Sequence, residues 1–335
     1  MNFVILGAGA WGTAMAIHLE KAGHTVSLAP RRLAQALEMS SRRENRDYLE
    51  GISLPQSLQI GWQLEPLLLE ADAVLLACPS HGLREACQRV QSAREGSRRL
   101  QAVISLAKGL EEKTGALSAD IIQEEIPDCA AGSLTGPTYA REVAEGKPAA
   151  MVLGMKGPDD LRNRYRDAFS GQTVRVYSSG DCRGVELGGC LKNVYAIASG
   201  VADGLQSGDN AKAALLTRSL AEMIRLGEEL GANRETFYGL SGFGDLVATC
   251  FGPWSRNREF GEKIGSGERP EDLLANRKTV VEGYRATLNF HELCQEKGLE
   301  APILEQTFAI LKGQKKPQEA LAELMQRDLK AESAG

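Results

Sequence analysis

A lysine inside a predicted helix is the first residue of this sequence that could do chemistry. The segment 183–204 carries apolar residues at helical spacing, which predicts one buried face, and Lys192 lies beside that face. One turn away stand Gly188, Gly189 and Ala196, which predict open space around the amine and offer no acid for an ion pair. Each glycine costs a helix about 1 kcal/mol relative to alanine, so something must approach closely there. We interpret Lys192 as an active-site group, although a surface lysine above a tight helix crossing would give the same pattern.

Two further stretches could hold charge at a site. Asp245 follows a glycine-rich loop, and it either caps the next helix or reaches Lys192 and holds its charge in place. Ser255, Arg256 and Asn257 open another predicted helix. A helix N-terminus with a guanidinium and an amide suits a dianionic phosphate, because N–H dipoles and charged donors converge there. A capping serine followed by solvated arginines is the alternative.

A glycine-rich turn predicts the binding of a dinucleotide. Gly7, Gly9 and Gly12 form a GxGxxG pattern, which lies between a predicted strand at 2–6 and a predicted helix at 14–21. This strand–turn–helix context makes the pattern informative. The first glycine permits the tight turn, the second lets a pyrophosphate approach the backbone, and the third lets the helix pack closely on the strand. The flanking elements argue against the alternative, a tight turn without a ligand.

Two adjacent arginines bear on the choice of dinucleotide. Arg31 and Arg32 follow the predicted strand 24–29 and Pro30, about 20 residues beyond the glycines. NAD sites usually carry an acid here for the ribose 2′-OH, whereas NADP sites place an arginine near the 2′-phosphate. No acid follows the strand in the sequence. We therefore expect NADP(H) to be preferred and NAD(H) still to be used, with two solvated arginines as the alternative.

Strand and helix patterns alternate over the first 180 residues. Apolar runs predict strands at 2–6, 24–29, 73–78, 102–106, 149–153 and 173–177. Helices are predicted between them, including one continuous polar helix over 33–50. This alternation is typical of α/β proteins with a parallel, doubly wound sheet, in which ligands gather at the carboxyl ends of the strands. Pro79 and Lys108 fall at such ends.

Beyond residue 180 the sequence changes to helical patterns with few β-branched runs. The 335 residues suit two domains better than one. We predict a Rossmann-type doubly wound domain over 1–180 and an all-α domain over 181–335.

Composition narrows the class of protein. The net charge of −5, from 39 basic and 44 acidic residues, disfavours nucleic acid as the main partner. Seven cysteines without a CxxC pair fit a reducing compartment, and we expect neither disulfides nor a metal site. No apolar run approaches the ~18 residues of a membrane span, so no membrane insertion is expected. The first predicted strand starts at residue 2, which leaves no room for a signal peptide and favours a cytoplasmic protein.

Eight motifs in fixed order resemble a known family. They are GAGAWGTA from residue 7, AKGLE at 107–111, LTGPTYA at 134–140, GVELGGCLKN at 184–193, DNAKAALLTRSLAEMIRLG at 209–227, GFGDL at 242–246, SRNR at 255–258 and VVEGYR at 280–285. Over nearly its whole length the chain resembles bacterial NAD(P)-dependent glycerol-3-phosphate dehydrogenase. The fold of that family, a Rossmann-type domain followed by a helical domain, matches the division predicted above.

The resemblance implies a role for each matching residue. Lys192 would be the proton donor or acceptor at the substrate oxygen, with Lys108 and Asp245 as the other catalytic residues. The substrate-binding residues would be Lys108, Gly136, Thr138, Lys192, Asn193, Asp245, Thr249, Ser255, Arg256 and Asn257. The cofactor-binding residues would be Gly7, Gly9, Ala10, Trp11, Gly12, Arg31, Arg32, Tyr48, Pro79, Lys108, Ala140, Arg256, Val280 and Glu282.

The activity that the resemblance implies is the reversible reduction of dihydroxyacetone phosphate to sn-glycerol 3-phosphate, which supplies phospholipid synthesis. Its partner would be this small substrate, and a homodimer is possible. One alternative is a β-hydroxyacid or 6-phosphogluconate-type dehydrogenase, which also pairs a Rossmann domain with a helical domain and a lysine. Another is a non-catalytic nicotinamide-sensing protein, which would need the glycine turn but not Lys108, Lys192 and Asp245 together.

Overall fold

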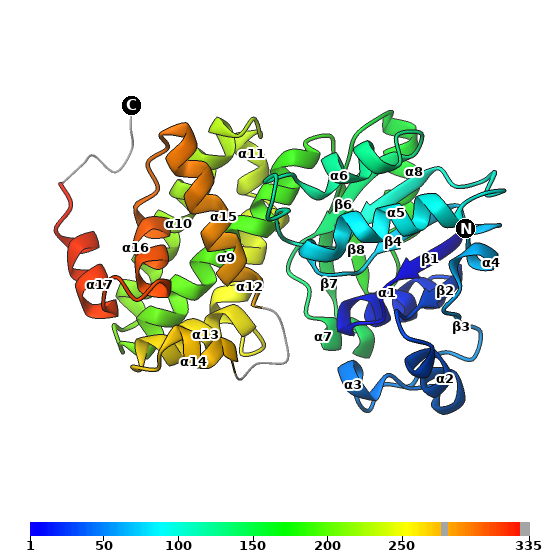
Figure 1. The fold of residues 1–335 in the computed structure, drawn as a ribbon, viewed down its shortest axis with the longest axis horizontal. Coiled ribbons are helices and arrows are strands. Elements are labelled where there is room, and N and C mark those ends of the chain that lie inside the picture. The colour runs from blue at the N-terminus through cyan, green and yellow to red at the C-terminus, as the bar shows by residue number, and fades with distance from the viewer. Residues whose placement is uncertain (276–280, 329–335) are drawn as a thin grey trace. The chain divides into compact units, whose positions relative to one another are not determined.

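The computed structural model describes residues 1–275 and 281–328, and the chain divides into two compact units (Figure 1). Unit 1 combines Met1–Cys190 with Gly227–Asp245, and unit 2 combines Leu191–Leu226 with Leu246–Gly335. The last described strand ends near residue 180, whereas the compact units part further along the chain, within a helix. The predicted domain boundary between residues 180 and 181 therefore remains a proposal, which rests on the change of pattern in the sequence.

Unit 1 is built on one eight-stranded sheet with the order β3-β2-β1-β4-β5-β6-β7-β8. Its strands are β1 (Asn2–Leu6), β2 (Thr25–Ala29), β3 (Gln59–Ile60), β4 (Ala73–Leu76), β5 (Ala102–Ser105), β6 (Ala130–Thr135), β7 (Ala149–Met155) and β8 (Val174–Ser179). The strand order reverses between β1 and β4, which is where doubly wound sheets bind their ligands. The predicted Rossmann-type α/β fold is confirmed.

One strand pair departs from the parallel arrangement that the sequence predicts. β6 and β7 run antiparallel, with Gly132 opposite Met155, while the other neighbouring pairs run parallel. The link between β6 and β7 contains the single short helix α7 (Ala140–Glu145). An antiparallel neighbour needs no crossover of the sheet, and so short a connection suffices for it.

Helices cover both faces of the sheet because its strands are apolar on both sides. In β1, Phe3 and Ile5 join one buried cluster, and Val4 and Leu6 join the other. Besides α7 the helices are α1 (Ala10–Lys21), α2 (Leu33–Arg42), α3 (Arg46–Leu49), α4 (Leu64–Leu68), η1 (Ser80–Gly82), α5 (Leu83–Ala93), α6 (Ser118–Glu125) and α8 (Asp159–Phe169). The helix predicted over 33–50 is wrong as one element, because Arg43 takes a left-handed conformation (φ 52°) that ends α2.

No strand follows β8 in the part of the chain that the structure describes, so the predicted all-helical region is confirmed. Its helices are α9 (Cys182–Gly204), α10 (Asp209–Glu229), α11 (Arg234–Phe237), η2 (Leu240–Gly244), α12 (Asp245–Phe251), α13 (Arg256–Gly265), α14 (Pro270–Ala275), α15 (Glu282–Lys297), α16 (Pro302–Leu311) and α17 (Pro317–Met325). The core of unit 2 gathers apolar side chains of several of these helices, among them Ile197, Phe260 and Ile310.

The prediction of one buried face on α9 is wrong, because residues 184–197 are buried at every position. The first part of this helix is covered by other elements of unit 1, and the backbone of η2 reaches Gly188. Further along, within unit 2, α13 and α15 pack on it at Ile197 and Asn193. A helix enclosed in this way carries no amphipathic stripe.

Candidate functional site

The glycine turn after β1 has the shape that a bound pyrophosphate requires. Gly7 has φ +116°, and a Cβ there would lie 2.5 Å from the carbonyl oxygen of Ala77 at the end of β4. A Cβ at Gly12 would overlap the carbonyl oxygen of Gly7. A Cβ at Gly9 would meet no protein atom within 4 Å, so open space lies over the first turn of α1. The unpaired N–H groups of that turn suit an anion, and the residues present therefore fit a dinucleotide.

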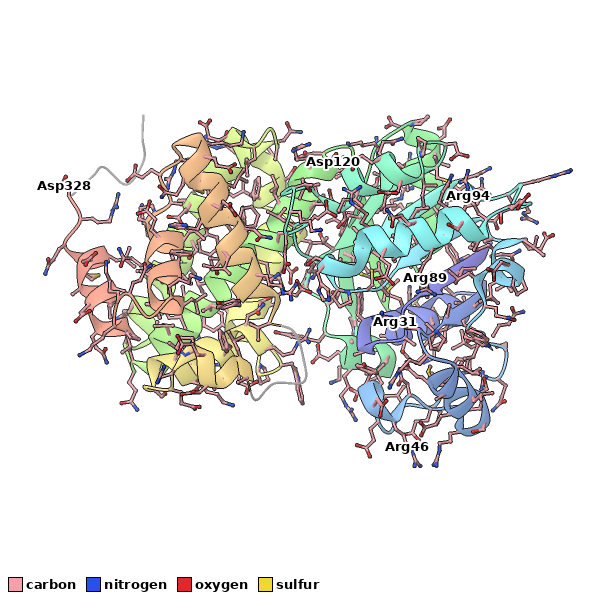
Figure 2. The ribbon with its side chains drawn as sticks, in the orientation of Figure 1. Arg31, Arg46, Arg89, Arg94, Asp120 and Asp328 are labelled. Atoms are coloured by element: carbon pink, nitrogen blue, oxygen red, sulfur yellow. The ribbon has the colours of Figure 1, made fainter. Side chains whose placement is uncertain are left out.

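The two arginines that are predicted to favour NADP(H) over NAD(H) are exposed. Arg31 and Arg32 follow β2, and Figure 2 labels Arg31. Arg32 lies 3.7 Å from the carboxylate of Asp47, and both side chains are more than half exposed. An acidic side chain therefore does lie near Arg32, although no acidic residue directly follows β2 in the sequence. It is Asp47, which belongs to α3. Tyr48, beside it, is also exposed.

Lys108 lies in a cluster at the carboxyl ends of β5 and β6. Its Nζ donates a hydrogen bond to the Gly136 carbonyl at 2.9 Å and contacts Asp245 Oδ2 at 2.6 Å. The Thr138 hydroxyl donates to the same carbonyl at 3.1 Å. The Asp245 side chain is only 3% exposed and that of Lys108 18%, so this ion pair is largely removed from water. Unit 1 thus brings together four of the predicted site residues.

Lys192 lies on α9 within unit 2, is 7% exposed, and donates from Nζ to the Thr249 hydroxyl at 2.6 Å. The predicted open space beside its helix is wrong. A Cβ at Gly188 would lie 2.7 Å from the Ser241 carbonyl oxygen, and one at Gly189 would lie 3.6 Å from Cγ of Lys108. The glycines do permit a close approach, as predicted, and protein atoms make that approach.

The start of α13 brings a helix N-terminus to α9. Ser255 caps α13, as predicted, because its hydroxyl accepts a hydrogen bond from the Arg258 amide at 3.2 Å. Asn257 is buried and donates from Nδ2 to Asn193 Oδ1 at 2.9 Å. Its Oδ1 accepts from the Gly283 amide at 3.0 Å. Arg256, between the cap and Asn257, is exposed.

Comparison with known proteins supports the same identification along almost the whole chain. Residues 2–160 match the family model for the N-terminus of NAD-dependent glycerol-3-phosphate dehydrogenase, and residues 181–322 match the model for its C-terminus. The chain belongs to this family. The glycerol-3-phosphate dehydrogenase [NAD(P)+] of Hydrogenovibrio crunogenus is 40% identical over 99% of this chain and 97% of that protein. The corresponding protein 1 of Salinibacter ruber is 41% identical with the same coverage.

A solved structure of the glycerol-3-phosphate dehydrogenase family has the same fold. The crystal structure of glycerol-3-phosphate dehydrogenase from Coxiella burnetii is 35% identical in sequence and has a TM-score of 0.90. The match covers 97% of this chain and 99% of that one. The resemblance found in the sequence is therefore confirmed, and the two alternative functions are set aside.

The motif AKGLE, which this chain shares with glycerol-3-phosphate dehydrogenases, contains Glu111, and the sequence analysis assigned no role to this residue. Glu111, three residues after Lys108, accepts two hydrogen bonds from Arg84 on α5, at 2.7 and 2.8 Å. The guanidinium lowers the pKa of Glu111 to about 2. This bidentate pair fixes the loop that carries Lys108. Glu111 lies within a recognised motif, so it could have been found, whereas nothing in the local sequence indicates Arg84.

The glycine turn has a brace that sequence reasoning also missed. Gln35 and Asn45 both donate from their side-chain amides to the Ala8 carbonyl, at 3.0 Å each. Asn45 donates further to the Thr13 hydroxyl at 2.8 Å. The break after α2 turns Asn45 inward, and no local pattern announces that break. The conformation of the turn therefore depends on side chains far along the chain.

Two buried carboxyl groups hold helix starts and were not among the predicted residues. Glu186 on α9 accepts a hydrogen bond from the Ala119 amide in the first turn of α6, and burial raises its pKa to about 8. Glu222 on α10 accepts from the amide of Leu304 at the start of α16, and burial raises its pKa as well. Glu222 also accepts a hydrogen bond from the Tyr195 hydroxyl of α9, so both carboxyl groups help to hold the helix that carries Lys192.

The remaining predicted residues lie at or near the starts of helices. Trp11 is in the first turn of α1, Pro79 precedes η1, Ala140 opens α7 and Glu282 opens α15. Val280 lies outside the described residues.

Groups of metal ligands, disulfides and membrane-spanning helices are absent from the part of the chain that the structure describes. No group of three His, Cys, Asp or Glu side chains there could hold a metal ion. The seven cysteines are free thiols. No helix between residues 1 and 275 or 281 and 328 is long and apolar enough to cross a bilayer.

Proposed function

We propose that Lys192, Lys108 and Asp245 are the catalytic residues with which this chain carries out the family's reaction, the NAD(P)-dependent reduction of dihydroxyacetone phosphate to sn-glycerol 3-phosphate. One observation in unit 2 supports the assignment above the others. The N-terminus of α13 lies beside α9, with Asn257 hydrogen-bonded to Asn193, the residue after buried Lys192. A proton donor thus adjoins a helix end suited to a phosphate.

In the reaction, a nicotinamide cofactor held at the glycine turn after β1 would supply the hydride for C2 of the substrate. The ammonium group of Lys192 donates its proton to the oxygen that develops negative charge at C2, and it takes a proton back in the reverse direction. The Thr249 hydroxyl, which accepts from Lys192 Nζ, orients that donor. Lys108 presents a cation that Asp245 and the Gly136 carbonyl hold in place.

The phosphate group would bind at the start of α13. There Arg256 offers a guanidinium, the cap and first turn offer N–H groups, and Asn257 holds the helix against α9. Binding of the phosphate would orient the C2 carbonyl. The phosphate site would thus raise the rate by positioning the substrate, without taking part in bond making or breaking.

Arg256→Ala should raise KM for dihydroxyacetone phosphate by about 10- to 100-fold, because a charge-assisted contact is worth about 1.5–3 kcal/mol. The preference over unphosphorylated dihydroxyacetone should fall by a similar factor. Steady-state NADPH oxidation with both ketones measures this, and NADPH binding is titrated separately because the family places this arginine near the cofactor too. Arg269→Ala, at a 72% exposed side chain, is the control. An unchanged preference for the phosphorylated ketone would move the phosphate site elsewhere.

We also propose that NADP(H) is preferred over NAD(H), with Arg31 and Arg32 beside the 2′-phosphate. The Arg31→Ala/Arg32→Ala double variant should weaken NADPH binding much more than NADH binding, and most at low salt, where screening is least. Fluorescence titration of both cofactors at two salt concentrations measures the effect. Arg46→Ala, on α3, controls for loss of surface charge. Equal wild-type Kd values, or equal weakening of both cofactors, would overturn the assignment.

The free thiols support a reducing, cytoplasmic location. A homodimer belongs to the same proposal, and the mass of the purified chain in solution tests it.

A further inference from the structure

Two helices of unit 2 cross with their backbones in contact. On α9, Gly200 and Gly204 face α13, since a Cβ on them would overlap the carbonyl oxygens of Arg258 and Glu262. On α13, Gly261 and Gly265 face α9 in the same way, against the carbonyl oxygens of Ile197 and Val201. We call these four glycines the glycine crossing. In each helix the two glycines are one turn apart, so the contact is backbone on backbone over two turns.

The crossing is parallel, and its direction matters for the site. Residue numbers rise together along the two helices, from the Asn193–Asn257 hydrogen bond to the contact of Gly261 with Ile197 and that of Gly265 with Val201. The N-terminus of α13 therefore lies beside the part of α9 that carries Lys192 and Asn193. The glycine crossing begins one helical turn beyond this point.

Polar contacts from the first turn of α13 join the two helices beside the crossing. At the site end, Asn257 joins Asn193 and the Gly283 amide of α15. From the first turn of α13, Arg258 Nη1 reaches Asp203 Oδ2 on α9 at 3.0 Å, and Lys212 of α10 binds the same carboxylate at 2.8 Å. Backbone contacts cannot relax by a change of rotamer, so the spacing of the two helices is stiff.

We propose that the glycine crossing sets the distance between Lys192 and the phosphate-binding start of α13, and thereby selects the substrate by the number of carbons between its carbonyl and its phosphate. This inference rests on the proposed function. Dihydroxyacetone phosphate has one methylene between these groups, and a longer homologue adds roughly 1.5 Å for the extra carbon–carbon bond. A methyl group at Gly261 or Gly265 must push the helices apart by roughly 1 Å to reach van der Waals contact.

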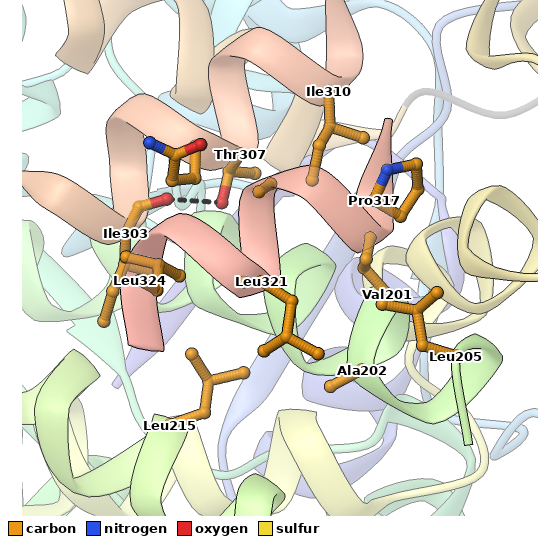
Figure 3. A pocket seen from close by; sticks show the side chains of 13 residues that line it. Val201, Ala202, Leu205, Leu215, Ile303, Thr307, Ile310, Pro317, Leu321 and Leu324 are labelled. Carbon is orange, nitrogen blue, oxygen red and sulfur yellow. Dashed lines mark hydrogen bonds between the residues drawn. The ribbon is translucent and has the colours of Figure 1, made fainter. Parts of the chain in front are cut away.

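α9 has room to yield on another face. Val201, Ala202 and Leu205 line an apolar cavity of about 50 Å³ that α10, α16 and α17 complete (Figure 3). The carbonyl oxygen of Val201 contacts the glycine crossing while its side chain faces this cavity. An added methyl at Gly265 can therefore shift α9 into the cavity without unfolding unit 2.

The test compares Gly261→Ala and Gly265→Ala with the wild type on two ketones, dihydroxyacetone phosphate and 1-hydroxy-2-butanone 4-phosphate, which has one more methylene. For Gly261→Ala, kcat/KM with the shorter ketone should fall by about 10²-fold, the effect of a 1 Å misplacement. It should fall much less with the longer one, so the ratio of the two constants should move at least about tenfold. Gly313→Ala is the matched control, because Gly313 has φ +66° and no atom near its Cβ position, so it loses stability without moving the crossing.

Folding is checked by NADPH binding and the melting temperature. Asp203→Asn is the second variant. It weakens the ionic contacts of Asp203 with Arg258 of α13 and Lys212 of α10 without adding an atom at the crossing, and it should move the ratio in the same direction by a smaller factor. Folded glycine variants with the wild-type ratio would overturn the inference, and so would a wild-type ratio in Asp203→Asn if neither glycine variant folds. A wild-type protein that does not reduce dihydroxyacetone phosphate would overturn the proposed function instead.

Discussion

Replacing Lys192 by alanine should lower kcat for dihydroxyacetone phosphate by about 10²–10⁴-fold, which is the usual loss when a general acid is removed. The reason is local, since Lys192 is 7% exposed and its Nζ is held by the Thr249 hydroxyl, so water cannot easily replace it as donor. KM should change less than kcat, because the variant keeps the phosphate site that we propose at the start of α13. Stopped-flow single turnovers with NADPH measure the chemical step directly.

Two further variants serve as controls in that experiment. One keeps the positive charge at position 192, and the other removes a lysine elsewhere on the chain. Lys192→Arg keeps a cation but holds its proton too tightly to act as an acid, so kcat should stay low. Lys312→Ala removes an exposed lysine and should leave kcat at the wild-type value. Near-normal turnover by purified Lys192→Ala would remove this residue from the mechanism.

Local sequence patterns predicted the features of the candidate site whose residues interact with near neighbours in the sequence. The glycine turn is the clearest case, because Gly7 and Gly12 each have a backbone reason to be glycine that spacing alone reveals. The cap at Ser255 is another, since its acceptor and donor are three residues apart. The apolar runs of β1 and β4 predicted these buried strands in the same way.

Contacts between distant segments were not predictable from local patterns. Lys108 and Asp245 meet across 137 positions, whereas the sequence offered for Asp245 either a helix cap or an approach to Lys192. β6 and β7 pair antiparallel through residues about 20 positions apart, such as Gly132 and Met155, and the acid near Arg32 comes from α3. The sequence predicts open space beside Lys192 because glycines lack side chains. In the structure the backbone of η2 occupies the space beside Gly188.

The second large effect concerns the Lys108–Asp245 pair. Asp245→Asn should lower the free energy of unfolding by about 3–5 kcal/mol, because it leaves a largely buried ammonium group without its carboxylate. Turnover should fall too, since Lys108 loses the contact that holds it at the Gly136 carbonyl. Chemical denaturation and steady-state kinetics measure the two effects on the same preparation.

A double variant separates the two roles of the pair. Replacing both partners of a buried ion pair by apolar residues of similar size is often neutral for stability. The variant Lys108→Met/Asp245→Leu should therefore recover most of the stability that Asp245→Asn loses, while its turnover stays at the level of the single variant or below it. A double variant that regained wild-type turnover together with its stability would show that the pair only joins the loop after β5 to the end of η2. Lys108 and Asp245 would then leave the list of catalytic residues.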